Sequence, residues 1–328
     1  MSKSNGNLNV KLYHGYGHTH NLIVYGHVLM NKPRTRARYT NNAIENIIHL
    51  LRLFQVKPIG GVTVSMVWAG QHLQSVSEKD GFFKFEWKSE THVTAGWHQV
   101  SVNITDENGQ VLSTGEGKIF VPHITQYAFI SDIDDTVLVS HSATIGKRLK
   151  VLFTKNPRTR KAFRDVVTHY GLLARAATTV DVPNPFFYVS SSEWNLYDDL
   201  VDFFNYNKLP EGTFLLNQIK QVSQLLKTGK TKHEGKLIRV MRILDAFPNQ
   251  RFVLLGDNSQ KDPAIYSSIA QKYPEKIYAI YIRNIVPRNE SDTRKLFSGL
   301  GEKGVHTCLF KDNTEAIAHS KSIGLIEG

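Results

Sequence analysis

The 328-residue sequence predicts an α/β protein in which a doubly wound, mainly parallel sheet is preceded by a small β-sandwich domain. Two observations lead to this prediction. Before residue 124, short segments alternate apolar and polar residues and are separated by turn-forming residues, as in antiparallel strands. After residue 125, short apolar segments alternate with longer segments of helical periodicity, as in a parallel sheet. We therefore expect two domains, 1–124 and 125–328.

Four strands and one helix are expected in the first domain. The strands cover residues 21–30, 61–68, 81–88 and 98–106, which are rich in β-branched and aromatic residues. The helix covers residues 41–54. Its apolar face consists of Ile44, Ile47, Ile48 and Leu51, and Asn42 and Glu45 have the spacing of an N-cap pair. This pattern favours a β-sandwich with one helix.

In the second domain, buried strands are expected where short apolar segments occur. They cover residues 127–130, 184–189, 251–255 and 276–282. Helices are expected between them, at residues 157–173 and 236–246. In the first of these helices, Phe163, Val166, Val167 and Tyr170 form one apolar stripe. Strands that alternate with helices in this way build an open, mainly parallel sheet.

The composition is that of a globular protein. Hydrophobic residues make up 41% of the chain, which is enough to form a core. No segment approaches the roughly 18 consecutive apolar residues of a membrane-spanning helix, and the polar start MSKSNGNLNV does not resemble a signal peptide. Cys308, the only cysteine, excludes an intrachain disulfide and is expected to be a small core residue. We expect a cytoplasmic protein.

The formal net charge of +11 is concentrated in one segment and favours anionic partners. Residues 139–165 hold eight Lys and Arg residues against Asp165 alone. We expect residues 139–180 to form a basic helical cap insert. Within it, Ile145, Leu149 and Leu152 share a face flanked by Lys147, Arg148 and Lys150, which suits either an anionic membrane surface or a cap with a solvated basic rim. No nucleic-acid-binding motif accompanies the charge, so no nucleic acid is expected as a partner.

Three acidic residues follow the first strand of the second domain. Asp132, Asp134 and Asp135 come just after residues 127–130, at the carboxyl end of the strand, where open α/β sheets bind ligands. Buried carboxylates so close together repel one another, so a cation is needed to neutralise them. A carboxylate can also attack phosphorus and form an aspartyl phosphate. The alternative is a solvated acidic turn in which Asp132 caps a helix.

Polar residues also follow two later strands. Ser190 ends the segment 186–189, and a hydroxyl with nearby backbone N–H groups suits the oxygens of a phosphoryl group. Gly256 and Asp257 end the segment 252–255, and Asp262 comes five positions later. Each of these features alone is equally typical of a turn or a helix cap.

Taken in order, these residues resemble the four motifs of the haloacid dehalogenase superfamily. The motifs are D-x-D-x-T at Asp132, a strand ending in Ser190, a helical lysine at Lys236, and G-D-x-x-x-x-D at Gly256. The sequences SDIDDTV, FFYVSSSEWNLY and FVLLGDNSQKDPAIY resemble the catalytic domain of the actin-patch-associated phosphatidate phosphatases over about residues 125–325. The N-terminal segments YHGYG and VYGHV resemble the leader of bacterial members of this family. The chain departs from that pattern at Glu193, where the resemblance leads us to expect proline.

The resemblance implies a role for each motif residue. Asp132 would attack phosphorus, and Asp134 would protonate the leaving oxygen and then activate water. Ser190 and Lys236 would stabilise the phosphoryl oxygens, with Lys232 and Lys230 as alternatives to Lys236. The cofactor would be Mg²⁺. Its ligands would be Asp132, the backbone carbonyl of Asp134 and Asp257, with Asp262 orienting the metal shell or Lys236.

The function implied by the resemblance is hydrolysis of phosphatidate to diacylglycerol and phosphate, with peripheral contact to an anionic membrane, at its inner surface. A phosphatase of soluble phosphomonoesters is the alternative enzyme. A third hypothesis is a binding module in which the sandwich docks to a lipid, glycan or protein and the second domain is inactive. Arg283 fits either a phosphate contact or a surface salt bridge. Nothing in the sequence indicates the oligomeric state.

Overall fold

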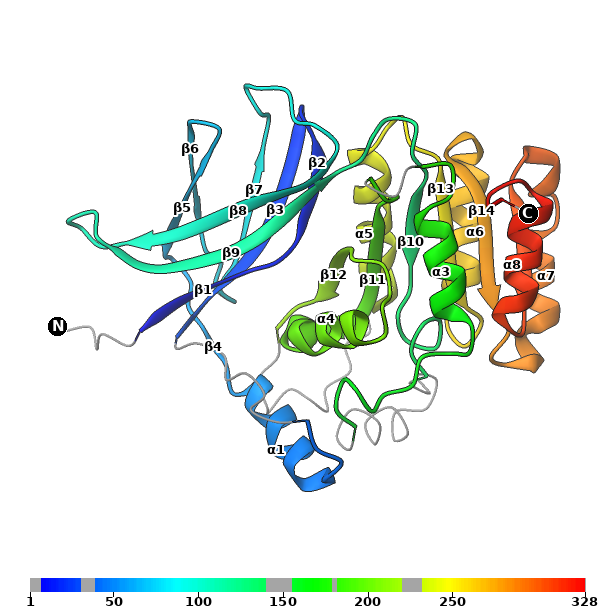
Figure 1. Cartoon of the computed structure of the whole chain (residues 1–328), viewed down its shortest axis with the longest axis horizontal. Coiled ribbons are helices and arrows are strands. Elements are labelled where there is room, and N and C mark those ends of the chain that lie inside the picture. The colour runs from blue at the N-terminus through cyan, green and yellow to red at the C-terminus, as the bar shows by residue number, and fades with distance from the viewer. Residues whose placement is uncertain (1–6, 31–38, 140–154, 179–181, 220–231, 328) are drawn as a thin grey trace. The chain divides into compact units, whose positions relative to one another are not determined.

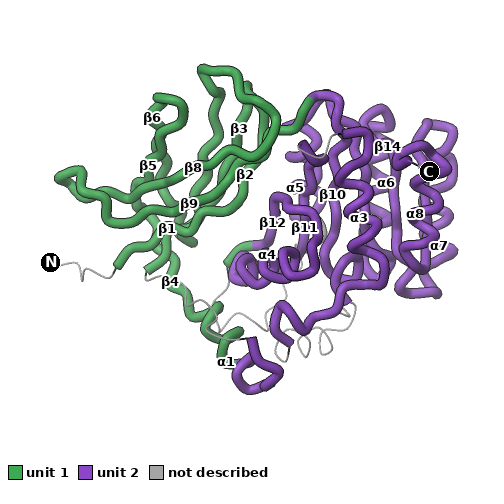
Figure 2. Tube along the Cα trace, viewed as in Figure 1, with its two compact units in different colours: residues 1–38, 48–123, 218–228 green, residues 39–47, 124–217, 229–328 purple. Residues whose placement is uncertain are grey.

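The computed structural model describes residues 7–30, 39–139, 155–178, 182–219 and 232–327 (Figure 1). The chain divides into two compact units (Figure 2), and the main division falls between His123 and Ile124. Most of the expected basic insert, including Lys147, Arg148 and Lys150, lies outside the described residues. Among the helices that are described, none has the length and apolar character needed to cross a membrane.

The first unit is built on a single sheet. Its strands are β1 (Leu8–Leu12), β2 (Gly15–His18), β3 (Asn21–Met30), β4 (Lys57–Pro58), β5 (Thr63–Trp68), β6 (Gln71–Val76), β7 (Phe82–Trp87), β8 (Gly96–Thr105) and β9 (Val111–Val121). The sheet order is β1-β3-β2-β9-β8-β5-β6, and β4 and β7 also pair with β3. All of these pairs are antiparallel except β2 with β9.

The expectation of a small β-sandwich is not confirmed by this topology. The ten-residue strand β3 pairs with β1 and β2 along one edge and with β7 and β4 along the other, so the described strands form one hydrogen-bonded sheet. The outer strands β6 and β7 then meet through side chains, where Ser75 Oγ donates to Lys84 O at 2.9 Å and Gln71 Nε2 donates to Lys88 O at 3.1 Å. The sheet therefore curves around its own core.

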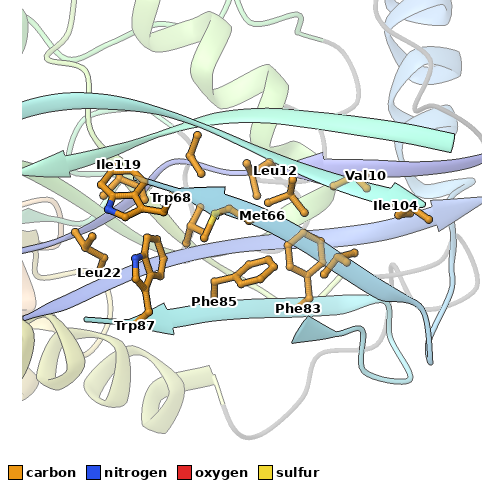
Figure 3. Packing of buried hydrophobic residues seen from close by; sticks show 14 of the residues in the cluster. Val10, Leu12, Leu22, Met66, Trp68, Phe83, Phe85, Trp87, Ile104 and Ile119 are labelled. Carbon is orange, nitrogen blue, oxygen red and sulfur yellow. The ribbon is translucent and has the colours of Figure 1, made fainter. Parts of the chain in front are cut away.

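That core is made by the alternate residues of the strands that point inward (Figure 3). Phe83 on β7 is 1% exposed and lies opposite Gly26 on β3. A Cβ atom at Gly26 would lie 2.2 Å from the ring of Phe83, so the ring packs directly on the glycine backbone. This close approach explains a glycine inside a long central strand.

Helix α1 (Ala43–Phe54) begins where the sequence predicts, because the Asn42 side chain accepts a hydrogen bond from Ile44 N at 2.9 Å. The face that is buried is a different one from the predicted apolar face. Leu50, Leu53 and Phe54 are buried, whereas Ile44 is 67% exposed and Ile48 43%. The helix therefore has apolar residues on both a buried and an exposed side.

The second unit contains a parallel sheet with the order β12-β11-β10-β13-β14-β15. Its strands are β10 (Ala128–Ser131), β11 (Phe186–Glu193), β12 (Thr213–Asn217), β13 (Phe252–Asp257), β14 (Ile277–Arg283) and β15 (His306–Phe310). Its α-helices are α3 (Val166–Ala174), α4 (Tyr197–Tyr206), α5 (Lys232–Ala246), α6 (Asp262–Lys272), α7 (Glu290–Phe297) and α8 (Asn313–Ser322). The chain starts at the centre of the sheet, builds one side, and then returns to build the other.

This order confirms an α/β unit with a parallel sheet and fixes where a ligand can bind. Helices α3 and α8 contact each other on one face, and α6 and α7 contact each other on the opposite face (Figure 1). Beside β10 the strand order changes direction, and in open α/β sheets such a position, at the carboxyl ends of the strands, is where ligands bind. The strands β10, β11 and β13 meet at this position.

Some boundaries differ from those predicted for this unit. The helix expected at residues 157–173 begins only at Val166, because Asp165 has φ of 58° and residues 156–160 form a turn around the Asn156 side chain, which accepts hydrogen bonds from Arg158 N and Thr159 N. Strand β12 was not predicted. Cys308 is half-buried in β15, so it is not a full core residue.

Shortening Phe83 should destabilise the first unit. Phe83→Ala removes a buried ring that nothing else can replace on Gly26, and we expect a loss of about 3–5 kcal/mol in the free energy of unfolding. Val67→Ala on β5 is the matched control, because Val67 is 60% exposed. Chemical denaturation measures both variants, and equal losses would contradict this description of the core.

Candidate active site

Asp132 is the first residue after the central strand β10 and is buried, with 5% of its surface exposed. Its backbone N–H donates to Leu255 O of β13 at 2.9 Å, which extends the parallel pairing by one residue. The chain then turns tightly, because Val137 N donates to Ile133 O and Asp135 has φ of 61°. Within this turn the Thr136 hydroxyl donates to Asp132 Oδ2 at 3.4 Å. The carboxylate of Asp132 is therefore fixed at the carboxyl edge of the sheet.

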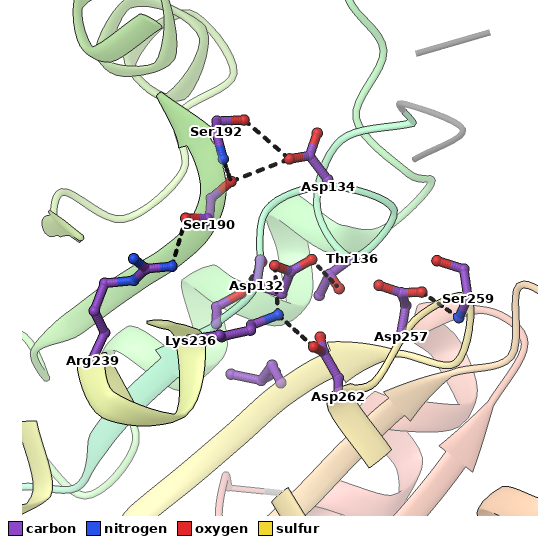
Figure 4. A network of polar contacts seen from close by, with 12 residues as sticks. Asp132, Asp134, Thr136, Ser190, Ser192, Lys236, Arg239, Asp257, Ser259 and Asp262 are labelled. Atoms are coloured by element: carbon purple, nitrogen blue, oxygen red, sulfur yellow. Dashed lines mark hydrogen bonds and ion pairs between the residues drawn. The ribbon is translucent and has the colours of Figure 1, made fainter. Parts of the chain in front are cut away.

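Lys236 of α5 reaches Asp132 from a distant part of the sequence (Figure 4). Its Nζ atom donates to Asp132 Oδ1 at 2.8 Å and also to Asp262 Oδ1. Burial alone would lower the pKa of Lys236, but Asp132 and Asp262 hold that pKa well above its ordinary value. Burial raises the pKa of Asp132 well above its ordinary value, and the nearby Lys236 opposes that shift. The ammonium group thus stabilises the ionised form of Asp132.

The end of β13 contributes a second pair of carboxylates. Asp257 is 1% exposed and accepts a hydrogen bond from Ser259 N, and Asp262 at the start of α6 is 2% exposed. A Cβ atom at Gly256 would lie 2.6 Å from Asp262 Oδ2 and 2.9 Å from the ring of Tyr266, so only glycine allows this approach. Burial, followed by the charge of Asp262, raises the pKa of Asp257 to about 7.

These residues have the composition of a site for a hard divalent cation. Each of Asp132, Asp257 and Asp262 offers an oxygen, and the three oxygens lie within 4.8 Å of one another. Asp262 Oδ2 is buried and has no hydrogen-bond partner among the described residues. Lys236 can neutralise only one of three carboxylates, so the cluster retains negative charge when all are ionised. Buried carboxylate oxygens in this arrangement fit Mg²⁺.

The carboxylate of Asp134 lies apart from that cluster and points towards strand β11 (Figure 4). Its Oδ2 atom accepts hydrogen bonds from Ser190 Oγ at 3.1 Å and from Ser192 Oγ at 3.2 Å. Ser190 Oγ in turn accepts from Ser192 N at 2.9 Å. If Asp134 contributes to a metal site, it does so through its backbone carbonyl, since its side chain is engaged elsewhere.

The structure thus arranges the site residues predicted from the sequence in two groups, with Asp134 and Ser190 apart from the other four. These residues are Asp132, Asp134, Ser190, Lys236, Asp257 and Asp262. Among the candidate lysines, Lys236 reaches the carboxylates, whereas Lys230 and the side chain of Lys232 lie outside the described residues. Glu193, found where proline was expected, is buried at the end of β11, where the pairing with β12 shifts register.

Several residues that support the site were not predicted. Ser192 holds Asp134, and Arg239 Nη2 donates to Ser190 O at 3.4 Å. Ser131 Oγ lies 2.7 Å from the Tyr170 hydroxyl and donates to Asp132 O at 2.6 Å. Ser192 could have been found from its place in the serine run 190–192. The others contact the site only through backbone atoms or a single hydroxyl, which leaves no motif in the sequence.

Asn258 organises the loop beside Asp257 and was also missed. Its side chain donates to Asn284 Oδ1 and Val286 O and accepts from the backbone N–H groups of Ile285 and Val286, at 2.7–3.0 Å. All four of its side-chain hydrogen-bonding positions are therefore used. Asp257 is held beside a loop that Asn258 makes rigid.

Arg283 does not have one of its two expected roles, the surface salt bridge. It is 2% exposed, so it does not form a surface salt bridge. Its nitrogens donate to Thr136 O, Lys311 O and Asn313 Oδ1. The guanidinium group therefore binds protein oxygens behind the catalytic loop.

Known proteins with similar sequences point to a phosphatase. Residues 127–284 match the family described as the catalytic domain of phosphatidate phosphatase APP1. Over 163 residues the chain is 32% identical to phosphatidate phosphatase APP1 of Saccharomyces cerevisiae, covering 47% of this chain and 25% of that protein. Over 184 residues it is 25% identical to an uncharacterized protein of Schizosaccharomyces pombe, covering 53% of this chain and 29% of that protein. The chain thus spans less than a third of either yeast protein.

The similarity of this chain to solved structures is too weak to support an argument about its function. A carbohydrate acetylesterase from Xanthomonas citri aligns with 95% of this chain and 73% of its own, at 10% identity and a TM-score of 0.32. The sequence matches instead relate residues 127–284 to a phosphatase catalytic domain. Within these residues the chain is similar to the APP1 family of phosphatidate phosphatases.

The raised pKa of Asp257 makes a prediction for the metal-free protein. Its folded pKa of about 7 lies above the ordinary 3.8, so the folded state holds a proton that the unfolded state releases. Stability from this group should be present at low pH and be lost as pH rises through about 7. In Asp257→Asn, which cannot ionise, the melting temperature in excess chelator should fall less between pH 5 and pH 8 than in the wild type. If the melting temperatures of the wild type and of Asp257→Asn changed equally across this pH range, the raised pKa of Asp257 would be contradicted.

Proposed function

We propose that this chain is a magnesium-dependent phosphatase that hydrolyses phosphatidate to diacylglycerol and phosphate through an aspartyl phosphate. The observation that carries the proposal is the convergence of Asp132, Lys236 and the Asp257–Asp262 pair at one edge of the parallel sheet. The sequence match of residues 127–284 supports the same chemistry. The strand order, with β10 between β11 and β13, supports a haloacid dehalogenase-like fold for this unit.

In the first step, an oxygen of Asp132 forms a bond to phosphorus while the bond from phosphorus to the leaving oxygen breaks. Asp134 gives its proton to that oxygen, so the alcohol leaves neutral. The Asp132 oxygens are held by Lys236 and Thr136, which limits the directions that the nucleophile can take. Ser190 and Ser192 hold Asp134 in a fixed orientation on the side facing β11.

In the second step, Asp134 takes a proton from water, and the water oxygen attacks phosphorus. The bond between phosphorus and Asp132 breaks, so inorganic phosphate leaves and the carboxylate is restored. A Mg²⁺ ion held by Asp132, Asp257 and the Asp134 carbonyl would neutralise the charge between the nucleophile and the phosphoryl oxygens. Asp262 keeps Lys236 beside Asp132 during both steps.

Removing the nucleophile tests the mechanism. Asp132→Asn keeps the size of the side chain but removes the attacking charge, so we expect kcat to fall by roughly three or more orders of magnitude. Circular dichroism should show that the fold persists. The matched control is Asp135→Asn, in the same turn but with no proposed chemical role. A variant Asp132→Asn that keeps more than about a tenth of the activity would exclude Asp132 as the nucleophile.

Phosphate release separates the substrate classes and tests the metal. The purified protein should release phosphate from phosphatidate in detergent micelles faster than from soluble sugar phosphates, nucleotides or phosphopeptides. Excess chelator should abolish the reaction, and added Mg²⁺ should raise the melting temperature of the wild type but not of Asp257→Ala. Faster turnover of a soluble phosphomonoester would favour the alternative enzyme, and full activity in chelator would reject the metal.

A lipid substrate implies that the protein reaches a membrane surface from the water phase. Segment 139–165 holds eight Lys and Arg residues. Arg160 is buried beside Asp199, and the other seven would be attracted to anionic headgroups. On α1, Ile44 and Ile48 are exposed on one side of the helix, which would suit the apolar side of such an interface. Both features support a peripheral protein at the inner membrane surface.

Charge reversal in the basic segment tests this contact. Each cation near an anionic surface contributes about 1 kcal/mol, and salt screens the attraction. The triple variant of Lys147, Arg148 and Lys150 to Glu should therefore sediment less with anionic liposomes and hydrolyse their phosphatidate more slowly. Hydrolysis of a small soluble phosphomonoester should be unchanged. If both activities fall together while liposome binding persists, these cations bind the phosphate of the substrate instead.

A further inference from the structure

Arg283 occupies an unusual position for a buried cation. It is the last residue of β14, and its backbone pairs with Asp257 on one side and with Phe310 on the other. Its side chain leaves the sheet edge, and Nε donates to Thr136 O at 3.3 Å, across 147 positions of sequence. This bond joins β14 to the turn that follows β10, although the two strands are not neighbours in the sheet.

The rest of the guanidinium group is held from the opposite side. Nη1 donates to Lys311 O at 3.4 Å, and Nη2 donates to Asn313 Oδ1 at the start of α8. The group lies over the ring of Phe163 at 4.2 Å and that of Phe310 at 4.9 Å. Its orientation is therefore fixed by the β15–α8 connection, so Thr136 is tied to a rigid part of the fold.

Thr136 connects Arg283 to the proposed nucleophile, Asp132. Its carbonyl accepts from Arg283, and its hydroxyl donates to Asp132 Oδ2 at 3.4 Å. Two successive hydrogen bonds therefore lead from Arg283 to the carboxylate that attacks phosphorus. Lysine could not replace arginine here without losing donors, because an ammonium group cannot reach three oxygens with the planar geometry of a guanidinium.

We propose that Arg283 is a positioning residue that holds Thr136, and through it Asp132, in the orientation required for attack. The inference rests on the proposed phosphatase function and assigns to Arg283 no contact with substrate. Burial lowers the pKa of Arg283 to about 10, so the group still carries its charge at neutral pH. A loss of orientation at the nucleophile reduces kcat without changing how the ground-state substrate binds.

The test uses Arg283→Lys and Arg283→Met, with a soluble aryl phosphate as substrate. We expect kcat to fall by about tenfold for Lys and further for Met, with KM within about twofold of the wild type. Tyr281→Phe is the matched control. It removes another buried polar group from β14, whose hydroxyl contacts Ser320 and His319 rather than the catalytic turn, so it should lower the melting temperature and leave kcat unchanged.

A double-mutant cycle with Thr136→Val shows whether Arg283 acts on Asp132 through Thr136. If Arg283 acts through the Thr136 hydroxyl, kcat of the double variant should lie within about threefold of kcat of whichever single variant is less active. Losses that multiply would overturn the proposal, as would a rise in KM with unchanged kcat, which would make Arg283 a substrate-binding residue. A Lys variant that behaves like Tyr281→Phe would reduce Arg283 to a structural role.

Deuterium exchange gives a readout that does not depend on activity. In Arg283→Lys, uptake should increase in a peptide covering residues 131–139 and stay unchanged in Tyr281→Phe. This measurement remains valid if the wild type hydrolyses none of the phosphomonoesters, which would reject the proposed function but not the anchor. Unchanged uptake in residues 131–139 would reject the anchor itself. If the Met variant does not fold, the Lys variant carries all of these measurements.

Discussion

The second unit is organised around the ion pairs of one lysine with two buried carboxylates. Lys236 contacts Asp132 and Asp262, and all three side chains are largely removed from water. A buried ion pair contributes little net stability, but the loss of either partner leaves an uncompensated charge in a low-dielectric environment. The elements that carry these residues, α5, the turn after β10 and the start of α6, must therefore reach one point together. Gly256 is required at that point because any larger residue would push Asp262 away.

Around this charged centre, further hydrogen bonds fix the loops. Ser131 and Tyr170 hold the carbonyl side of Asp132, Asn258 holds the loop beside Asp257, and Arg283 holds Thr136. Such buried polar groups are favourable only when their hydrogen bonds are satisfied, which makes each loop conformation specific. Catalysis needs this rigidity because a carboxylate that attacks phosphorus must already point along the line of the reaction. Two of the residues that supply rigidity, Tyr170 on α3 and Arg283 on β14, therefore come from elements outside the motifs.

The first unit solves a different physical problem. Its strands would leave exposed edges if the sheet were flat, and such edges pair readily with other chains. Here the outer strands β6 and β7 contact each other, so the curved sheet covers its own apolar face. The long strand β3 makes this possible by pairing along both edges, and the Phe83–Gly26 contact lets the sheet bend closely around the core.

The sequence by itself determined the strands that carry the site and the residues that follow them. Asp132, Ser190 and Asp257 could be predicted because each lies just after or at the end of an apolar strand, and parallel strands place their carboxyl ends at one edge. Strand β3 and the start of α1 were predicted for the same local reason, since periodicity and an N-cap are written in neighbouring residues. Tertiary structure decided the features that depend on distant pairing. The single curved sheet follows from the pairing along both edges of β3. The exposure of Ile44 depends on which side of α1 other parts of the chain cover. The hydrogen bond that holds Thr136 comes from Arg283, which lies 147 positions away in the sequence. No local pattern encodes these contacts, because their free energy arises only when the chain is folded.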